Sequence, residues 1–223
     1  MHVNTTANPL YNSQSQKGWG ICRPALINHF KKYLGKLTTV LDIGCAAGGY
    51  TKYLNELGYK AKGIDIDLPE ISQADNSFVL ANADFLPFAN NSFDHCIAIN
   101  VLEHLNDTEC LKEIRRVIRK NVCGIVPALE SNSNISFFNL TYHAYTDLTH
   151  LRYYNLVLIK DLLLSCGFQV VDLRYTNPAN VIGAAIHAMR FPLNVAEFLG
   201  NLLNKGPFFR KYFTTIMFIA EKE

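Results

Sequence analysis

The residues best suited to chemistry follow an apolar run that ends in an acid and several very small residues: Val40, Leu41, Asp42, Ile43, Gly44, Cys45, Ala46, Ala47, Gly48, Gly49 and Tyr50. Small residues let a backbone turn come into contact with a ligand, because a Cβ would collide with it. A carboxylate inside such a turn would repel a pyrophosphate but suits a ligand that carries positive charge. S-adenosylmethionine (SAM), with an ammonium and a sulfonium, is such a ligand. We therefore expect it to contact Asp42, Gly44, Cys45, Ala46 and Gly48.

Two further acids lie where the next strands are expected to end. A carboxylate at the carboxyl end of a strand faces the crevice in which ligands bind, and it can accept hydrogen bonds from both ribose hydroxyls. We predict that Asp65 binds the ribose and that Ile66 contacts the adenine face. Asp84 and the Phe85 amide would supply an acceptor and a donor to adenine. The structural alternatives are a helix cap at Asp65 and an ordinary polar turn at Asp84.

The elements that must position these residues alternate between short apolar runs and amphipathic ones, which is typical of a doubly wound α/β fold with a parallel sheet. Strands are predicted near 38–43, 60–66, 77–81, 93–99, 121–126, 168–174 and 212–220. Helices are predicted near 22–35, 48–58, 105–119 and 155–166. The last strand closes the chain and needs an edge with which to pair, so an antiparallel insertion beside the preceding strand is expected.

A nicotinamide-dependent oxidoreductase is the first alternative to a SAM-binding protein. Residues 44–49 also match a degenerate dinucleotide fingerprint, and Asp65 lies where an acid would bind a ribose. Three features favour SAM: Asp42 inside the turn, a third motif at Asp84, and the arrangement of the terminal strands. The sequence also lacks a convincing Tyr-x-x-x-Lys catalytic pair.

Together these motifs resemble those of class I SAM-dependent methyltransferases, in the subgroup that contains the ubiquinone and menaquinone methyltransferases. The similarity runs from about Leu37 to Cys123 and rests on residues 40–45, 63–67, 83–88, 92–94 and 101–105. It implies a seven-stranded Rossmann-like sheet whose last strand is inserted antiparallel. It also implies SAM as the cofactor and S-adenosylhomocysteine as the product. One departure is Ala46, where the family usually has glycine; a methyl group is tolerated there if the turn keeps a negative φ.

The resemblance also places the motif that begins at Asn100 at the floor of the crevice, beside the methionine end of SAM. Asn100 is therefore predicted to contact the cofactor. His104, in the same motif, is a candidate catalytic residue that would contact cofactor or acceptor. A lone histidine is more often structural, and that alternative stays open for His104.

Residues 142–154 combine polar groups with aromatic rings, as expected of a small-molecule pocket. Their core resembles an Asp-x-Thr-His-x-Arg element found in many such methyltransferases. Methyl transfer is an in-line displacement, so the protein must align the acceptor and, for a hydroxyl, remove a proton. We predict His150 as the catalytic base, Asp147 as its orienting group and Arg152 as an anchor for a carboxylate or phosphate. The other predicted substrate contacts are Tyr142, His143 and Tyr145.

Two alternatives apply to the same segment. Hydrogen bonds that merely pin the loop explain its polar residues equally well. His143, Asp147 and His150 could also bind a metal if they shared a helix face. Because Leu148 and Thr149 give no helical stripe and methyl transfer needs no metal, we expect no metal site.

Length and composition indicate one domain with elaborations. The 223 residues are 49% apolar with a formal charge of +2, and no basic arm suggests a nucleic-acid partner. We expect an N-terminal segment and lid helix over 1–36 and a SAM-binding domain over 37–223. The domain would carry a substrate-facing insert at about 128–154 and a helical insert at about 178–206.

Six scattered cysteines without a C-x-x-C pair predict buried thiols in a reducing compartment rather than a zinc site. The sequence has no apolar run of about 18 residues that would span a membrane, and residues 1–17 have no apolar core of the secretory kind. These observations predict a cytoplasmic protein.

The sequence thus predicts a SAM-dependent methyltransferase that acts on a small molecule, at oxygen rather than nitrogen or carbon. If the regions 19–33 and 181–203 leave an apolar mouth, the acceptor could be lipid- or sugar-linked, or the surface could form a homodimer instead of a monomer. A non-catalytic SAM-binding scaffold protein is the second alternative.

Overall fold

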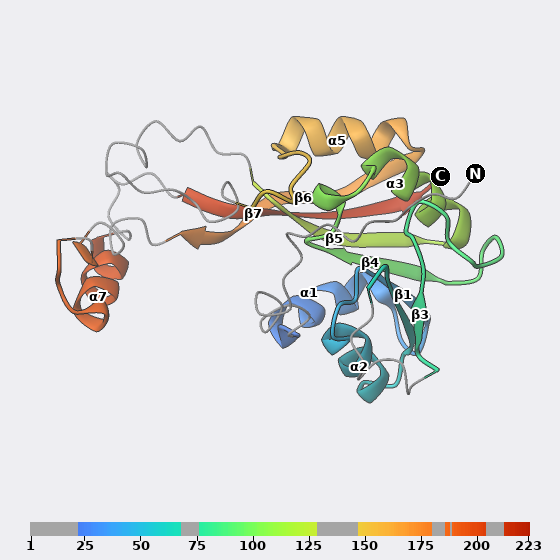
Figure 1. Ribbon diagram of the computed structural model, residues 1–223, viewed down its shortest axis with the longest axis horizontal. Coiled ribbons are helices and arrows are strands. Elements are labelled where there is room, and N and C mark those ends of the chain that lie inside the picture. Colours follow the sequence, from blue (N-terminus) through green and yellow to red (C-terminus); the bar gives the residue numbers. More distant parts are fainter. Residues whose placement is uncertain (1–21, 68–75, 129–146, 180–185, 188, 204–211) are drawn as a thin grey trace.

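The computed structural model describes residues 22–67, 76–128, 147–179, 186–187, 189–203 and 212–223 (Figure 1). Seven strands form one sheet in the order β3-β2-β1-β4-β5-β7-β6. The strands are β1 Thr39–Ile43, β2 Lys60–Asp65, β3 Phe78–Leu80, β4 His95–Ile99, β5 Asn121–Pro127, β6 Phe168–Ala179 and β7 Tyr212–Lys222. The first five run parallel, and β7 lies antiparallel between β5 and β6. The predicted fold class and the inserted last strand are therefore confirmed.

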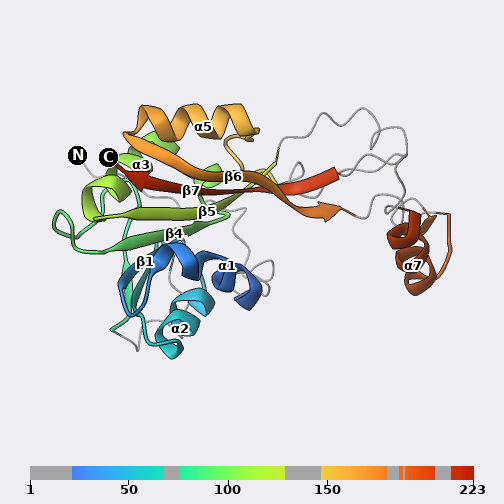
Figure 2. The ribbon, with the colours of Figure 1, turned by 180° about the vertical axis from the view of Figure 1, so that it is seen from behind.

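Helices cover both faces of the sheet (Figures 1 and 2). Helices α1 Pro24–Leu34 and α2 Gly49–Glu56 pack on one face, and α3 Asp107–Val117 and α5 Leu156–Ser165 pack on the other. Successive side chains of a strand point to opposite faces, so Val40 joins the core under α1 and α2 while Leu41 joins the core under α3 and α5. This two-sided burial explains why the central strands are continuously apolar.

Helix α1 packs into the core, and the lid expected over this region stays a prediction. Its buried residues Ile27, Phe30 and Leu34 recur at helical spacing and are fully enclosed against the sheet. The side-chain hydroxyl of Tyr33 in the same helix donates to Asp172 Oδ2 of β6 at 3.0 Å. The helix is thereby fixed to the sheet at both its apolar and its polar face.

Local signals explain where two helices begin and end. Asn106 and Asn155 precede α3 and α5, and each side chain accepts a hydrogen bond from a backbone N–H of the first turn. Gly167 follows α5 with φ of +78°, a conformation that favours glycine beyond a helix end. These caps place the chain so that β4 and β6 are each joined to a helix by a short connection.

The sheet reverses its strand order between β1 and β4, because β1 leads to β2 on one side and β4 leads to β5 on the other. Ligands of doubly wound sheets bind outside the carboxyl ends of the strands at such a point. Ile43 pairs with both Ile64 and Ala98, so the residues that follow β1, β2 and β4 meet at one edge of the sheet.

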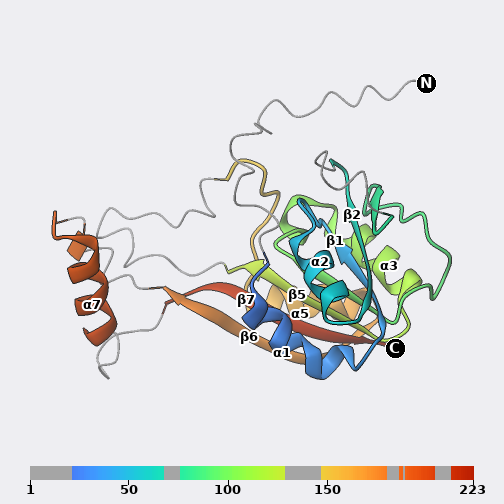
Figure 3. The same ribbon diagram turned by 90° about the horizontal axis from the view of Figure 1, so that it is seen from below.

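The β6–β7 hairpin is longer than predicted. Strand β6 continues five residues past position 174 to Ala179, and pairing with β7 extends to Ala179 opposite Tyr212. Pro178 signals a strand end in the sequence, but proline is tolerated in edge strands, and β6 is an edge strand of the sheet that the described residues form. Figures 1 and 3 show the hairpin running beyond the rest of the sheet, with α7 Leu193–Leu203 at its far end.

Helix α7 exposes several large apolar side chains: Leu193, Val195, Phe198, Leu202 and Leu203. No helix in the described part of the chain is long and apolar enough to cross a membrane.

Candidate active site

The turn after β1 alternates between ordinary and left-handed backbone. Gly44, Ala46 and Gly48 have φ of +68°, +46° and +76°. A Cβ on Gly44 would lie 2.5 Å from Val101 Cγ2, and one on Gly48 would lie 2.3 Å from the Phe78 ring, so both positions need glycine. A negative φ was the condition for tolerating a methyl group at Ala46, and the structure does not meet it. The backbone at Ala46 is held in a left-handed conformation, which residues with a Cβ avoid.

Asp42 is buried beneath this turn rather than open to a ligand. Its Oδ2 accepts a hydrogen bond from Thr51 Oγ1 in α2 at 2.7 Å, which ties the end of β1 to the helix after the turn. Burial raises the pKa of Asp42 to about 7. Its predicted contact with the cofactor stays a prediction, and its evident role is to fix the base of the turn.

Asp65 is oriented over the turn by backbone amides. Its Oδ2 accepts from the Ala46 N–H at 2.9 Å and its Oδ1 accepts from the Asp67 N–H at 3.0 Å. Burial raises the pKa of this carboxyl, while the amide hydrogen bonds oppose that shift. Each oxygen keeps a further lone pair with which to accept a hydroxyl hydrogen. Ile66 beside it is 69% exposed, so an apolar face is available next to the carboxylate.

The Asp84 loop combines a polar turn with a buried acceptor. The amides of Asp84 and Phe85 donate within the turn, to Asn82 Oδ1 at 2.9 Å and Asn82 O at 3.1 Å. The amide of Phe85, predicted as a donor to adenine, is thus already engaged. Asp84 Oδ1 is buried without a hydrogen-bond partner among the described residues, and desolvation raises the pKa of this carboxyl. The carboxyl therefore keeps an acceptor for an exocyclic amine.

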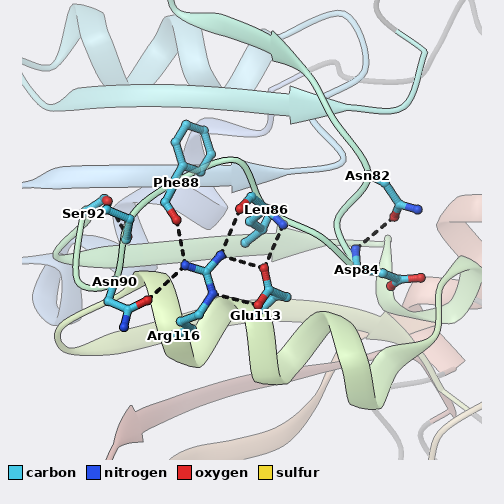
Figure 4. Close-up of polar contacts among 9 residues, drawn as sticks. Asn82, Asp84, Leu86, Phe88, Asn90, Ser92, Glu113 and Arg116 are labelled. Carbon is cyan, nitrogen blue, oxygen red and sulfur yellow. Dashed lines mark hydrogen bonds and ion pairs between the residues drawn. The ribbon is translucent and has the colours of Figure 1, made fainter.

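Helix α3 holds this loop through an ion pair (Figure 4). The Arg116 guanidinium donates to the carbonyls of Leu86 and Phe88 at 2.9 and 2.7 Å. It also pairs with Glu113 at 2.7 Å, and Glu113 in turn accepts from the Leu86 N–H at 2.8 Å. The side chains of this pair bond the backbone groups of the loop, which pairs with no strand. They thereby fix the segment that follows Asp84.

At the crevice floor, Asn100 leaves β4 in a left-handed conformation with φ of +50°. Its amide still donates to Ile125 O of β5 at 2.8 Å, so the turn is anchored to the sheet. The chain then enters the short 3-10 helix η3 Leu102–His104. Glu103 in η3 is only 1% exposed, and neither of its carboxyl oxygens has a hydrogen-bond partner among the described residues. Burial raises the pKa of Glu103 to about 8.

His104 has a defined orientation. Its Nδ1 lies 3.3 Å from Thr149 O and 2.9 Å from Thr149 Oγ1. Because a carbonyl oxygen only accepts, the proton of the neutral ring is assigned to Nδ1, so Nε2 carries the lone pair of the ring. Nε2 lies 4.0 Å from Glu103 Oε1. Burial lowers the pKa of His104.

His150 lies against His104, with ring centroids 4.7 Å apart. Asp147 orients the segment: its Oδ2 lies 3.6 Å from His150 Nε2, and its Oδ1 accepts from the Thr149 N–H and hydroxyl at 2.9 and 2.6 Å. The Leu151 N–H donates to Glu103 O at 2.8 Å, which joins this segment to η3. The structure thus brings together His104 and His150, the two predicted catalytic residues, which are far apart in sequence.

Arg152 is engaged elsewhere. Its guanidinium forms an ion pair with the buried Asp107 of α3, whose Oδ2 also accepts from the Tyr154 hydroxyl at 2.9 Å. The charge predicted to anchor an acceptor therefore neutralises a buried carboxylate, and the anchoring role remains a prediction. The predicted substrate contacts Tyr142, His143 and Tyr145 lie outside the described residues.

A surface hollow in the described part of the chain lies in a different place. Its lining includes Thr39, Lys60 and Phe93, which lie at or before the starts of β1, β2 and β4. The hollow is therefore at the opposite end of the strands from the predicted site and contains none of the predicted site residues.

Residues 41–125 match a family model described as a methyltransferase domain. The matched stretch runs from β1 into β5 and contains every residue predicted to bind the cofactor. Residues 41–125 form a SAM-dependent methyltransferase domain of class I. SAM is the cofactor of this methyltransferase domain. The small residues of the glycine turn allow close approach of such a ligand, and the Asp65 carboxylate can accept hydrogen bonds from its ribose.

The methyltransferase domain and its flanking elements share their fold with 1,6-didemethyltoxoflavin-N1-methyltransferase from Burkholderia thailandensis, a structure that contains 1,6-didemethyltoxoflavin and S-adenosylhomocysteine. The TM-score is 0.59 at 18% identity, and the similarity covers 94% of this chain and 81% of that one.

Relatives in sequence match less than half of this chain. The uncharacterized protein MJ1252 of Methanocaldococcus jannaschii is 44% identical over 85 residues, 36% of this chain and 32% of that protein. The malonyl-[acyl-carrier protein] O-methyltransferase of Pseudescherichia vulneris is 30% identical over 101 residues, 43% of this chain and 40% of that protein. The chain thus spans less than half of the length of these curated relatives.

Several residues that shape the site of the methyltransferase domain were not predicted: Thr51, Glu103, Glu113, Arg116 and Thr149. Glu103 carried the clearest signal, since it is an acid inside an apolar motif beside His104. The contacts of the others are tertiary, and no local pattern indicates them.

Proposed function

We propose that this chain transfers a methyl group from SAM to an oxygen of a small-molecule acceptor. When bound, SAM supplies a methyl group already activated by its sulfonium. The observation that carries the proposal is the cluster of Glu103, His104 and His150 beside the carboxyl end of β4. A hydroxyl acceptor must lose a proton as the methyl moves, and this cluster gathers groups that can bind the oxygen and take part in that loss. The similarity to a protein named as an O-methyltransferase supports the same choice.

The residues divide the work by position. We propose that the turn at 44–48 lies under the methionine part of SAM, and that Asp65 accepts hydrogen bonds from the ribose. Asp84 would accept from the adenine amine, with its loop held in place by Arg116. His104 and His150 would lie beside the acceptor oxygen, and His150 would assist the loss of its proton.

Finer aspects of the proposal rest on fewer observations. We keep the placement beside the ubiquinone and menaquinone methyltransferases because the motif at 101–105 carries the histidine of this site. All six cysteines are free thiols, which supports a reducing compartment, and we propose the cytoplasm. The exposed apolar side chains of α7 support either a lipid-linked acceptor or a homodimer.

The test is transfer of a radiolabelled methyl group from SAM to a panel of hydroxyl, amine and carbon acceptors. We expect turnover with a hydroxyl acceptor and its loss in His150→Ala, with binding of S-adenosylhomocysteine preserved. Turnover only with amines would contradict the choice of oxygen. Cofactor binding without turnover across the panel would favour a non-catalytic SAM-binding protein.

A further inference from the structure

Three side chains at the proposed acceptor site form a donor set of a familiar kind. Glu103, His104 and His150 each offer one ligand atom, and these atoms all lie within 4.8 Å of one another. Two imidazoles and one carboxylate are a common ligand set for divalent ions of the first transition row. Two of the ligands lie in η3 and the third lies in the segment after residue 146. These two parts of the chain are more than 40 positions apart in the sequence.

Glu103 is the observation that points to a missing partner. A buried carboxyl group is normally hydrogen-bonded, because leaving its oxygens unpaired costs free energy. Both oxygens of Glu103 are buried and unpartnered among the described residues, and the side chain is only 1% exposed. The 4.0 Å between Glu103 Oε1 and His104 Nε2 is too long for a hydrogen bond. Two ligands on one Zn²⁺ lie about 3.3 Å apart, so shifts of less than about 1 Å would close the site.

His104 is oriented as a metal-binding histidine usually is. A ligating histidine donates its other ring N–H to a carbonyl or carboxylate, which fixes the tautomer and the ring. His104 Nδ1 faces Thr149 O at 3.3 Å, so its Nε2 lone pair points toward Glu103. The Asp147 carboxylate lies beside the ring of His150, with Oδ2 3.6 Å from Nε2. Asp147 also accepts from Thr149, and so one acid supports both rings.

We propose that Glu103, His104 and His150 bind a divalent transition-metal ion, Zn²⁺ foremost, that holds the oxygen of the methyl acceptor. This inference rests on the proposed function for the role of the ion, but not for its binding. Three protein ligands leave at least one coordination position open for a substrate oxygen. Imidazole ligands favour Zn²⁺ and its neighbours over Mg²⁺, which prefers oxygen ligands and retains water.

The ion gives the acceptor a route to deprotonation. Coordination lowers the pKa of a bound hydroxyl, so its O–H bond breaks near neutral pH and the proton passes to solvent. The oxygen lone pair then forms the new C–O bond as the C–S bond of the sulfonium breaks and its electron pair stays on sulfur. His150 serves the proton loss as a ligand of the ion rather than as the direct acceptor of the proton.

The test titrates Zn²⁺ by calorimetry into the full chain, freed of metal with a chelator and kept reduced. Wild type, Glu103→Gln and His104→Ala are compared with His29→Ala. His29 is a matched control because it also lies near a carboxylate, 3.8 Å from Asp172, but outside the cluster. We expect one Zn²⁺ per chain in wild type and His29→Ala, and at least about tenfold weaker binding in the two cluster variants. Thermal unfolding and binding of S-adenosylhomocysteine verify that each variant is folded.

Co²⁺ then reports on the ligands. Nitrogen and oxygen ligands give d–d bands alone, whereas binding to the cysteines would add an intense thiolate charge-transfer band. A thiolate band, or wild-type affinity no higher than that of His104→Ala, would overturn the metal site. Full methyl transfer by metal-free protein would overturn its catalytic role and leave the proposed function intact. Conversely, absent cofactor binding would refute the proposed function while Zn²⁺ binding could still be measured.

Discussion

The methyl group of Ala46 is the main difference between this cofactor turn and the family motif, which usually has glycine at this position. Ala46 has φ of +46° in the cofactor turn, where a side chain costs about 1–2 kcal/mol and glycine costs nothing. Glycine also loses more entropy on folding, so we expect Ala46→Gly to stabilise the fold by about 0.5–1 kcal/mol net. The melting temperature should rise by about 1–4 °C.

Ala47→Gly is the control, because Ala47 is exposed and has no positive φ. It gains nothing from glycine and should lower the melting temperature slightly. Equal losses in both variants, measured by calorimetric scanning, would contradict the strain assigned to Ala46.

His95 makes a pH-dependent contribution to stability. It is 2% exposed, and burial, followed by the charge of Lys120, lowers its pKa to about 4. Between pH 6.5 and 4 the unfolded chain binds a proton that the folded chain does not, so this contribution is lost as the pH falls. From pH 7 to pH 5 we expect wild type to lose about 2 kcal/mol more unfolding free energy than His95→Gln. Urea unfolding at the two pH values measures the difference, and parallel curves would show that His95 is not the cause.

At the scale of elements, helix α3 is predicted to control the adenine loop through Arg116. Arg116→Met removes the hydrogen bonds to Leu86 O and Phe88 O, so the loop that carries Asp84 loses its anchor. We expect KM for SAM to rise about tenfold while kcat changes little. Lys112→Met is the matched control, since Lys112 forms an exposed pair with Glu109 on the same helix. An equal effect of both substitutions on KM would rule out a positioning role for Arg116.

Most elements could be predicted because their signals are local. The apolar run at 38–43 and the alternation of apolar and amphipathic segments each reflect backbone geometry within a few positions. What escaped prediction depends on contacts between distant segments. Strand β6 continues past position 174 only because β7 pairs with it.

The site was predictable to the same extent. Asp65 and Asp84 follow strands, so topology alone places them at one edge. The contact of Thr149 with His104 spans 45 residues, and no spacing rule reveals it. The left-handed conformation of Ala46 was also hidden, because alanine gives no sign of it.

At the scale of the whole molecule, the long hairpin extends past the carboxyl end of β5, at the same end of the sheet as the cofactor edge, and α7 lies at its far tip (Figure 3). Phe198 on this helix is 68% exposed. We therefore expect Phe198→Ser to change neither the melting temperature nor the affinity for S-adenosylhomocysteine, because surface substitutions usually alter stability by less than about 0.5 kcal/mol. Ile159→Ser, a fully buried position on α5, should be severely destabilised by comparison. A marked loss of cofactor affinity in Phe198→Ser would show that α7 contributes to the cofactor site.

The central claim is that the edge of the sheet at 44–48 and Asp65 binds SAM. Calorimetric titration of S-adenosylhomocysteine and NAD into wild type and Asp65→Ala tests it most directly, with the exposed Asp67→Ala as control. Loss of charge-assisted ribose hydrogen bonds costs about 1.5–3 kcal/mol, so Asp65→Ala should bind S-adenosylhomocysteine about ten- to a hundredfold more weakly than wild type. Asp67→Ala should bind it nearly as wild type does, and NAD should bind weakly or not at all. Tighter binding of NAD, or unchanged affinity for S-adenosylhomocysteine in Asp65→Ala, would contradict the account.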